Sequence, residues 1–499
     1  MKNILEWLEI SVKDNETKPI YSDLETQITF GETYLNAKRI GSGLDRLLTS
    51  EAPVAVFMDR CVYTPVGYFG VLYSGRAYAP IDAKLPNKRI EKILEGLQPE
   101  KVLTQKHLAE VVAEYVPKDR ICFYEDLVES ELDEDRLLTI RRNKIASDPL
   151  CIIFTSGSSG NPKGVMLSHQ SLMTYLNAYS RVMEINSEDK IGNQSPLDYI
   201  AAIRDIYLPI KEGCQTWIIP KDYFMAPGKL FDFLNEHEIT SVGWSVAAFT
   251  IASTLGVFSE YSLKTLKKIC FSGSVMPCKV LRQWQENLPD AHFVNQYGPT
   301  EATASCTYYD VDHLVEEDEV LPIGKAYEGY RVYLIKEDNT EAAPGEEGEI
   351  CVAGPGLTLG YYNDKERTDS AFMPNPLVKT YVERMYRTGD IGVFREDGNL
   401  EFHGRRDRQV KHMGHRVELD EIECAANGVD GVAECGCIYD HAKEKLHLYY
   451  SGTAEKKEIT KELRNLLPGF MVPRKVERLE ELPKLPNGKI DYTKLKENI

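Results

Sequence analysis

The segment that most constrains the fold is an apolar run that ends in a loop of glycine, serine and threonine. Residues 150–154 read Leu-Cys-Ile-Ile-Phe, and the decapeptide Thr155–Gly164 follows directly. A short apolar run closed by glycines is typical of a buried strand. We expect a second short strand at residues 165–167 and a helix that begins near Ser168. Strand-like and helical stretches alternate along the rest of the chain, which predicts an α/β protein of layered sheets and helices.

The whole chain has the composition of a globular protein with a large core. Its 499 residues favour more than one domain, and 42% hydrophobic with 27% charged residues is ordinary for such a protein. The formal net charge of -18 argues against general binding of nucleic acid or of an anionic membrane, yet local donors can still hold ATP. The eleven cysteines show no recurring spacing, so we expect reduced thiols and not a metal or disulfide framework.

A domain boundary is expected near Gly404. Upstream, Asp397-Gly398-Asn399 predicts a hairpin turn between strands at 391–394 and 400–402. Downstream, the charged stretch 405–409 suits an exposed linker. We therefore expect a large domain over residues 1–403 and a small α+β domain over residues 404–499. The N-terminus lacks the basic start of a signal peptide, and no apolar run is long enough to span a bilayer, so a cytoplasmic protein is expected.

The loop Thr155–Gly164 has the chemistry of a phosphate site. Glycines let backbone N–H groups approach an anion, hydroxyls add donors, and a lysine adds charge. Two familiar phosphate motifs are excluded: Pro162 breaks the spacing of a P-loop, and Ser159 replaces a glycine that the dinucleotide fingerprint requires. A flexible surface turn is the plain alternative, but the position after a buried strand favours phosphate binding.

The loop resembles the signature of the acyl-adenylate-forming superfamily, which includes acyl-CoA synthetases, luciferases and the adenylation domains of nonribosomal peptide synthesis. Further segments match in the expected order over nearly the whole chain. They are Ala77–Asp82, Asn295–Glu301, Gly348–Ile350, Tyr386–Asp390, Gly404–Lys411 and Asn487–Asp491. One such match could be chance, but an ordered set of this length is not expected by chance.

The resemblance implies a reaction in two halves. A carboxylate attacks the α-phosphate of ATP and expels pyrophosphate, and a thiol then attacks the acyl-adenylate and expels AMP. No protein nucleophile is needed, because the enzyme positions two anions and stabilises the added charge. In this scheme the loop binds the phosphates through Thr155, Ser156, Gly157, Ser158, Ser159, Gly160 and Lys163.

The resemblance also implies a nucleotide site built from distant segments. Asn295 and Tyr297 would hold the adenine, and Gly273 and Ser274 would line its other face. Gln296 and Gly298 would also contact the nucleotide. Thr300 would contact phosphate, and Glu301 would bind Mg²⁺, which prefers oxygen ligands. Asp390 would accept both ribose hydroxyls, with Arg405 and Phe402 beside the nucleoside.

Three further roles fall in the small domain. Lys489 would neutralise the substrate carboxylate and the α-phosphate as they approach each other. Asp407 matches the hinge of the family, about which the small domain swings between two poses. One pose brings in Lys489, and the other opens a thiol channel beside Gly414.

The identity of the acid is the open part of the sequence interpretation. Amino-acid-activating relatives carry an aspartate for the α-amino group, and the register set by Asp205 and Gly213 places Ile200 there, with Asp198 two residues away. We therefore favour a substrate without an ordinary α-amino anchor, such as an aryl acid, a hydroxy acid or a dicarboxylate. The alternative is an amino acid, including a β-amino acid, held by Asp198. The remaining pocket residues are expected to be Ala201, Arg204, Trp244, Cys270, Ser272, Gln296, Ala304 and Ser305.

Arg204 leaves two interpretations open: it could pair with a second carboxylate or a phenolic oxygen of the substrate, or it could be a solvated helix residue.

The thiol acceptor is expected to be a separate molecule. The chain ends ten residues after Lys489, so we expect the phosphopantetheine arm of a separate carrier protein, with CoA as the second choice. Two rival classes are a P-loop kinase or ATPase, which the failed spacing disfavours, and a non-catalytic nucleotide-binding protein.

Overall fold

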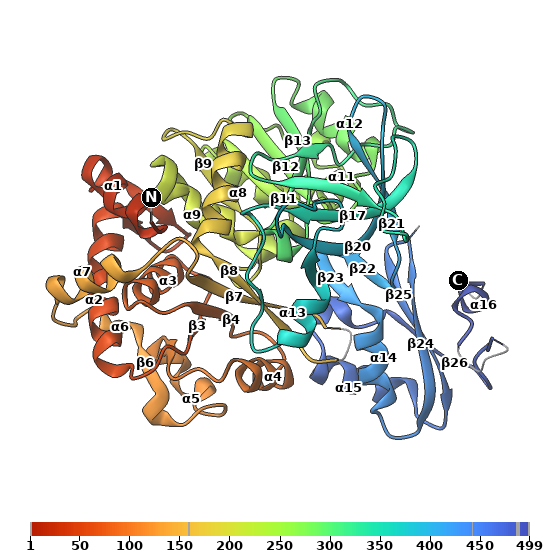
Figure 1. Ribbon diagram of the computed structural model, residues 1–499, viewed down its shortest axis with the longest axis horizontal. Coiled ribbons are helices and arrows are strands. Elements are labelled where there is room, and N and C mark those ends of the chain that lie inside the picture. The colour runs from red at the N-terminus through yellow and green to blue at the C-terminus, as the bar shows by residue number, and fades with distance from the viewer. Residues whose placement is uncertain (1, 158–159, 442, 486–489, 498–499) are drawn as a thin grey trace. The chain divides into compact units, whose positions relative to one another are not determined.

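The computed structural model describes residues 2–157, 160–441, 443–485 and 490–497 (Figure 1). The chain divides into two compact units. The larger unit contains Met1–Ala83, Leu97–Ile153 and Gly164–Arg406. The smaller unit contains Asp407–Ile499 together with two earlier segments, Lys84–Gly96 and Phe154–Lys163. The expected boundary at Gly404 remains a prediction, and the change of unit falls between Arg406 and Asp407.

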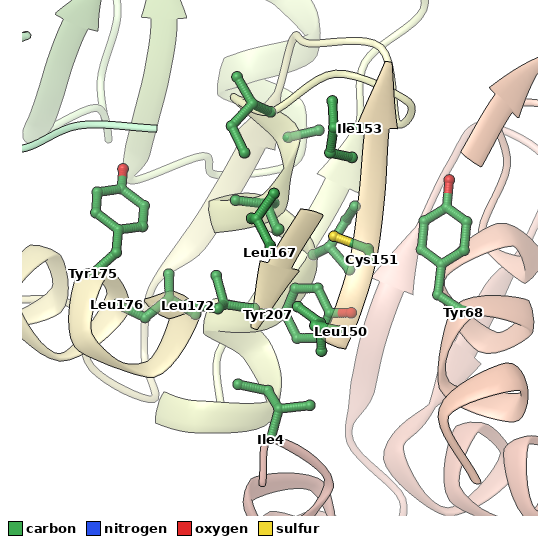
Figure 2. Packing of buried hydrophobic residues seen from close by; sticks show 14 of the residues in the cluster. Ile4, Tyr68, Leu150, Cys151, Ile153, Leu167, Leu172, Tyr175, Leu176 and Tyr207 are labelled. Carbon is green, nitrogen blue, oxygen red and sulfur yellow. The ribbon is translucent and has the colours of Figure 1, made fainter. Parts of the chain in front are cut away.

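A seven-stranded sheet, mostly parallel, carries the apolar run of the sequence as β7 (Pro149–Thr155). The strand at residues 165–167 is confirmed as β8 (Lys163–Ser168), and Ser168 caps the helix α8 (His169–Val182). Figure 2 shows Leu150 and Ile153 of β7 in one buried cluster with Leu167 of β8 and Leu172 of α8. The other strands, in sheet order around β8 and β7, are β18 (Gly360–Tyr361), β4 (Tyr78–Asp82), β3 (Val54–Met58), β5 (Val102–Thr104) and β6 (Ile121–Phe123).

A nine-stranded sheet forms the second layer of the larger unit. Its central strands are parallel, so their carboxyl ends meet at one edge, where α/β proteins place their ligands. In order the strands are β15 (Lys325–Ala326), β14 (Thr307–Asp310), β13 (His292–Tyr297), β12 (Lys268–Ser272), β11 (Ser241–Ser245), β9 (Lys190–Asn193), β10 (Gln215–Ile218), β1 (Pro19–Ser22) and β2 (Gln27–Thr29).

Helices cover these sheets and bury their apolar faces. In Figure 1, α3 lies beside β3 and β4, and α2 packs against α3, in the red and orange part of the chain. The α helices of the larger unit are α1 (Leu5–Asn15), α2 (Phe30–Leu47), α3 (Tyr63–Tyr73), α5 (Ala109–Val112), α6 (Tyr124–Leu127), α7 (Glu134–Asn143), α8, α9 (Ala202–Glu212), α10 (Pro227–Glu236), α11 (Val246–Thr254), α12 (Cys278–Asn287) and α13 (Lys365–Ala371).

A third sheet of antiparallel strands contains the expected hairpin. The turn at 397–399 joins β20 (Arg384–Phe394) to β21 (Leu400–Arg405), which confirms that prediction. The expected linker is shorter than predicted, because Arg405 belongs to β21 and Gln409 is buried at the start of β22. The other strands of this sheet are β16 (Arg331–Ile335), β17 (Glu347–Ala353) and β19 (Phe372–Pro374).

The smaller unit is α+β and has its own apolar core, formed by residues such as Ile422, Leu448 and Ile459. The layered α/β class and the small second unit are therefore as predicted. Within the residues described, no helix is long and apolar enough to cross a membrane. The elements of this unit are α4 (Asn87–Leu97), β22 (Gln409–His412), β23 (His415–Glu418), α14 (Leu419–Asn427), β24 (Val432–Asp440), β25 (Lys445–Gly452), α15 (Lys456–Leu466), β26 (Lys475–Arg478) and α16 (Tyr492–Lys496).

The N-terminal cap of α8 gives a test of the fold. The Ser168 hydroxyl accepts from the Ser171 N–H at 3.0 Å, and the cap is buried. We expect Ser168→Ala to lower the free energy of unfolding of the larger unit by about 1 kcal/mol, because the Ser171 N–H loses its partner. Urea unfolding measures this loss. Ser187→Ala, at an exposed serine, is the control and should change little; equal effects of the two variants would contradict the role of the cap.

Candidate active site

The end of β13 builds one wall of the expected nucleoside site. Asn295 is fixed by its Nδ2, which donates to the Pro322 carbonyl at 2.8 Å. Tyr297 is the last residue of β13, and Gly298 follows it directly. A Cβ at Gly298 would lie 2.5 Å from the Cα of Ser305, so only glycine fits this close approach. The motif thus has a steric cause as well as a chemical one.

Asp390 lies at the centre of the residues expected around the ribose. Its carboxylate accepts one hydrogen bond from the Tyr297 hydroxyl and one from the Arg405 guanidinium, and its side chain is buried. The pairing of β20 with β21 sets Asp390 directly opposite Arg405. Burial, with Asp390 adding to it, raises the pKa of Tyr297, so the hydroxyl stays protonated and donates. The Phe402 ring centroid is 6.2 Å from that of Tyr297.

The backbone around these side chains adds to the same arrangement. The Thr388 hydroxyl accepts from the Asp390 N–H at 3.0 Å, and the Thr388 carbonyl accepts from Arg405 at 3.1 Å. Glu349 accepts from the Gly389 N–H at 3.1 Å and from Arg387 at 2.9 Å. The motif Tyr386–Asp390 is therefore held from both sides. A carboxylate held in this way is prearranged to accept hydroxyl donors.

Thr300 and Glu301 lie on a short 3₁₀ helix, Thr300–Ala302. Glu301 is fully buried, and its carboxylate accepts from the Tyr361 hydroxyl at 2.7 Å. Sequence reasoning missed Tyr361, and no local motif marks it. Among the described residues no cluster of three or more acidic, histidine or cysteine side chains could hold a metal ion. Glu301 nevertheless fits Mg²⁺, which in nucleotide sites uses one or two carboxylates together with phosphate oxygens.

The turn after Glu301 has an unusual backbone. Thr303 and Ala304 both have positive φ, at 53° and 72°. Residues with a Cβ rarely adopt this conformation, and such strain collects at functional sites. The Thr303 hydroxyl donates to the Gly356 carbonyl at 2.8 Å and helps to hold the turn. Sequence reasoning placed Ala304 in the acid pocket but did not predict this strain.

Gly273 and Ser274 follow β12 at the same sheet edge as the end of β13, because the two strands are parallel neighbours. Gly273 has φ of +97°, which favours glycine. Ser272, Gly273 and Ser274 are all partly exposed. Their placement agrees with the expected second wall of the nucleoside site, and their contact with adenine remains a prediction.

The strand register corrects one expected member of the acid pocket. Trp244 pairs with Phe271, whereas Cys270 pairs with Gly243, so Trp244 faces the opposite side of the sheet from Cys270 and Ser272. Trp244 packs in a separate apolar core with Phe249, and its Nε1 donates to the Gly192 carbonyl at 2.9 Å. It therefore does not share a wall with Cys270.

Arg204 is neither a solvated residue nor an uncommitted cation. Its side chain is buried, and its Nε lies 2.9 Å from the Asp205 carboxylate. Its remaining donors reach the Gly243 carbonyl and, at 3.6 Å, the Cys270 sulfur. Asp205 also accepts from Asn193 at 2.8 Å. Arg204 is therefore not the solvated helix residue that was one prediction. Its guanidinium binds Asp205 and the Gly243 carbonyl, so it has a structural role in place of the predicted contact with the substrate.

The loop between β9 and α9 carries Asp198, Ile200 and Ala201. Ile200 is buried in the main core, and Asp198 and Ala201 are partly exposed. Burial, followed by the nearby Asp82, raises the pKa of Asp198 to about 6. Asp82 itself pairs with Lys221 at 2.9 Å. Asp198 thus titrates within the range in which many enzymes work.

Gln296 and Ser305 contact each other, since the Ser305 hydroxyl donates to Gln296 Oε1 at 3.3 Å. Both side chains are buried. Within the part of the chain that the structure describes, Gln296 Nε2 has no hydrogen-bond partner. A buried donor of this kind is costly unless a ligand or water satisfies it, which suits the expected position beside the substrate.

The expected phosphate loop, apart from Gly164, belongs to the smaller unit. Thr155 ends β7, and its buried hydroxyl has no partner among the described residues. Ser156 donates to the Arg416 carbonyl at 2.8 Å, and Gly160 has φ of +76°. Ser158 and Ser159 lie outside the described residues, and Lys163 begins β8. An unused buried hydroxyl beside glycine amides fits phosphate binding.

Lys489 also lies outside the described residues, between Lys484 and Ile490, which pair as an isolated antiparallel bridge. Asp407 is exposed and accepts from the Gln409 N–H at 3.2 Å. Gly414 lies in the turn between β22 and β23 with φ of +81°. Their expected roles as catalytic lysine, hinge and thiol channel remain predictions.

Tyr297 at the end of β13, Glu301 on the 3₁₀ helix that follows, and Asp390 within β20 form the set of side chains expected of an enzyme of the adenylate-forming class. The family model described as "AMP-binding enzyme" matches residues 8–362, and that described as "AMP-binding enzyme C-terminal domain" matches residues 421–489. The chain therefore belongs to the AMP-binding enzyme family.

Relatives of known function support this assignment. The chain is 30% identical to a D-alanine–D-alanyl carrier protein ligase from Bacillus licheniformis, over 99% of each chain. It is 29% identical to tyrocidine synthase 1 from Brevibacillus parabrevis over 91% of this chain, but it spans only 41% of that protein. It shares the fold of an artificially fused adenylation–PCP di-domain from Klebsiella oxytoca, with a TM-score of 0.84, 19% identity and coverage of 96% and 94%.

The role of Arg204 gives a prediction. We expect Arg204→Met to lower the free energy of unfolding by about 3–5 kcal/mol, because the Asp205 carboxylate would remain buried without its cation. Urea unfolding measures the change. The control is Arg181→Met, at an exposed arginine that pairs with Glu328 and should contribute about 1 kcal/mol or less. A stable Arg204→Met enzyme with a changed choice of acid would show that Arg204 contacts the substrate.

Proposed function

We propose that the protein activates a carboxylic acid as acyl-AMP, releases pyrophosphate, and transfers the acyl group to the phosphopantetheine thiol of a separate carrier protein. The observation that carries the proposal is the buried Asp390 carboxylate, held by Tyr297 and Arg405 where the family binds the ribose. Family membership supports the same conclusion. A P-loop kinase is disfavoured because Pro162 breaks the P-loop spacing, and a non-catalytic nucleotide-binding protein would bind ATP without exchanging pyrophosphate with any acid.

The chain supplies no nucleophile for the first half-reaction, because the substrate carboxylate attacks the α-phosphate itself. Two anions must approach each other, so the enzyme needs fixed positive charge and hydrogen-bond donors. Lys489 and Thr300 supply these at the reacting groups, and the loop 155–163 holds the phosphates that leave as pyrophosphate. Mg²⁺ held by Glu301 would neutralise phosphate charge.

The second half-reaction needs the lysine to leave and a thiol to enter. The change of unit falls directly before Asp407, which supports its proposed role as the hinge. Gly414, with its left-handed backbone, would border the thiol channel. A residue that acts in only one half-reaction is best placed on a mobile element.

A separate carrier protein is the acceptor that we favour. The match to the D-alanine–D-alanyl carrier protein ligase covers 99% of each chain, and the name of that enzyme states its acceptor. CoA is the alternative, and incubation of labelled acid and ATP with each acceptor separates the two.

Because ATP is consumed, we also propose that the enzyme works in the cytoplasm.

Two side chains limit the choice of acid substrate. Arg204 is engaged by Asp205 and Gly243, so it does not hold a second carboxylate or a phenolic oxygen of the substrate. Ile200 offers no charge for an α-amino group, and we still favour an acid without an ordinary α-amino anchor. The specific observation for the alternative is Asp198, a partly exposed carboxyl that could hold a cationic group.

The catalytic lysine gives a direct test of the function. We expect Lys489→Ala to abolish acid-dependent exchange of pyrophosphate into ATP, because the approaching anions lose their shared cation. Thiol transfer from supplied acyl-adenylate should be largely spared. The control is Lys484→Ala, which removes a nearby lysine paired with Glu434 and should leave both activities intact. Normal exchange by Lys489→Ala would refute the assignment.

The titration of Asp198 tests the choice of acid. If an ammonium group binds Asp198, the KM for that acid should fall as the pH rises from about 5 to about 7, because the carboxyl becomes charged above its pKa of about 6. Asp198→Asn should remove this dependence, and an acid without an amino group should not show it. Pyrophosphate exchange over a panel of amino, aryl and aliphatic acids measures the effect. A pH-independent KM for every amino acid that reacts would exclude Asp198 as the anchor.

A further inference from the structure

A buried ion pair inside the smaller unit joins α4 to α14. Arg89 on α4 approaches Glu421 on α14, with NH1 2.6 Å from Oε1. The two side chains are only 7% and 2% exposed. Neither residue belongs to a motif that sequence reasoning assigned to ATP. A fully desolvated pair of this kind needs good geometry and further hydrogen bonds, so its other contacts are informative.

The second oxygen of the same carboxylate reaches the phosphate loop. Glu421 Oε2 accepts from the Gly157 N–H at 3.2 Å. Nearby, Lys92 donates to the Gly160 carbonyl at 2.6 Å. Arg89 and Lys92 are three residues apart on one helix, so they face the same side. The helix α4 thus reaches the loop directly through Lys92 and, by way of the Glu421 carboxylate, through Arg89.

This arrangement has the donor set of a phosphate site. An arginine fork and a backbone N–H beside glycines are the groups with which proteins bind phosphate. The two oxygens of the Glu421 carboxylate stand in for two oxygens of one phosphate, because both anions accept hydrogen bonds in the same way. Burial raises the pKa of Glu421, although Arg89 and the Gly157 N–H oppose the shift. Keeping the Glu421 carboxylate charged inside the fold therefore costs free energy.

We propose that Arg89 and the Gly157 N–H form an anion site for a terminal phosphate of ATP or for pyrophosphate, and that Glu421 competes for that site as an internal anion. The inference rests on the proposed function, since it assigns the loop the role of phosphate binding. Glu421 must leave before the phosphate binds, and it returns after pyrophosphate departs. The step makes or breaks no covalent bond.

The proposal and a purely structural role of the ion pair predict opposite effects of Glu421 substitutions on anion binding. If the ion pair only stabilises the fold, loss of either partner should lower stability and weaken ligand binding alike. If Glu421 competes with phosphate, loss of Glu421 should tighten anion binding, and loss of Arg89 should weaken it. Opposite effects from the two halves of one ion pair are therefore the diagnostic result.

The experiment titrates inorganic pyrophosphate with MgCl₂ into the full chain in a calorimeter. We expect Arg89→Gln to raise the Kd by about tenfold, the effect of one charge-assisted hydrogen bond. Glu421→Gln should lower the Kd, by about threefold or more, because the neutral amide competes poorly with an anion. The controls match the charge changes on exposed side chains: Lys88→Gln on α4 and Glu462→Gln on α15 should leave the Kd unchanged.

Glu421→Asp and Arg89→Lys provide a second pair that keeps the charges. A shorter acid reaches the loop less well and should also tighten pyrophosphate binding, whereas lysine should recover part of the affinity lost in Arg89→Gln. A higher Kd in both Glu421 variants, or an unchanged Kd in Arg89→Gln, would overturn the proposal. Acid-dependent exchange by the unmodified enzyme is measured alongside: its absence with every acid refutes the proposed function, whereas its presence without opposite shifts refutes only this inference.

Discussion

The hydrogen bond from Tyr297 to Asp390 is the contact on which the expected nucleoside site depends, because it joins two sheets of the larger unit. Tyr297 ends a strand of the nine-stranded sheet, and Asp390 lies in the antiparallel sheet that follows it in the chain. Arg405 completes the arrangement from the neighbouring strand β21. A shift of either sheet would separate these groups, so the packing of the sheets and the geometry of the site are one constraint. Prearranged groups of this kind spare the enzyme the cost of ordering them when the substrate binds.

Two buried charges beside the expected acid pocket compensate each other. Arg204 and Asp205 neutralise each other at the carboxyl end of the parallel strands, and Arg60 donates to the neighbouring Asn193. These contacts tie the start of α9 to β9 and β11. The acid pocket expected from the sequence thus borders a charged layer that serves the fold. We therefore expect the choice of acid substrate to depend on side chains outside this charged layer. One of them is Gln296, whose buried Nε2 has no hydrogen-bond partner among the described residues.

Much of the fold could be predicted from the sequence, because strands, helix caps and tight turns are set by a few residues that are adjacent in the chain. The strands around the glycine loop, the cap at Ser168 and the hairpin at 397–399 each follow from a few adjacent residues. Trp244 could not be assigned in this way, because the face of a strand residue depends on its register with neighbouring strands. The burial of Arg204 also escaped prediction, since a helix residue looks solvated until its ion partner is placed. Tyr361 was missed for the same reason, as its contact with Glu301 joins residues far apart in the chain.

The composition of the smaller unit has a consequence for how the protein is made. Its contacts join segments that are far apart in the chain: Arg89 and Glu421 are 332 residues apart. During synthesis α4 leaves the ribosome long before α14, so Arg89 has no partner for most of that time. Contacts between distant residues form slowly, because a long loop must close before they add stability. We therefore expect the smaller unit to complete its structure only after the whole chain has been made.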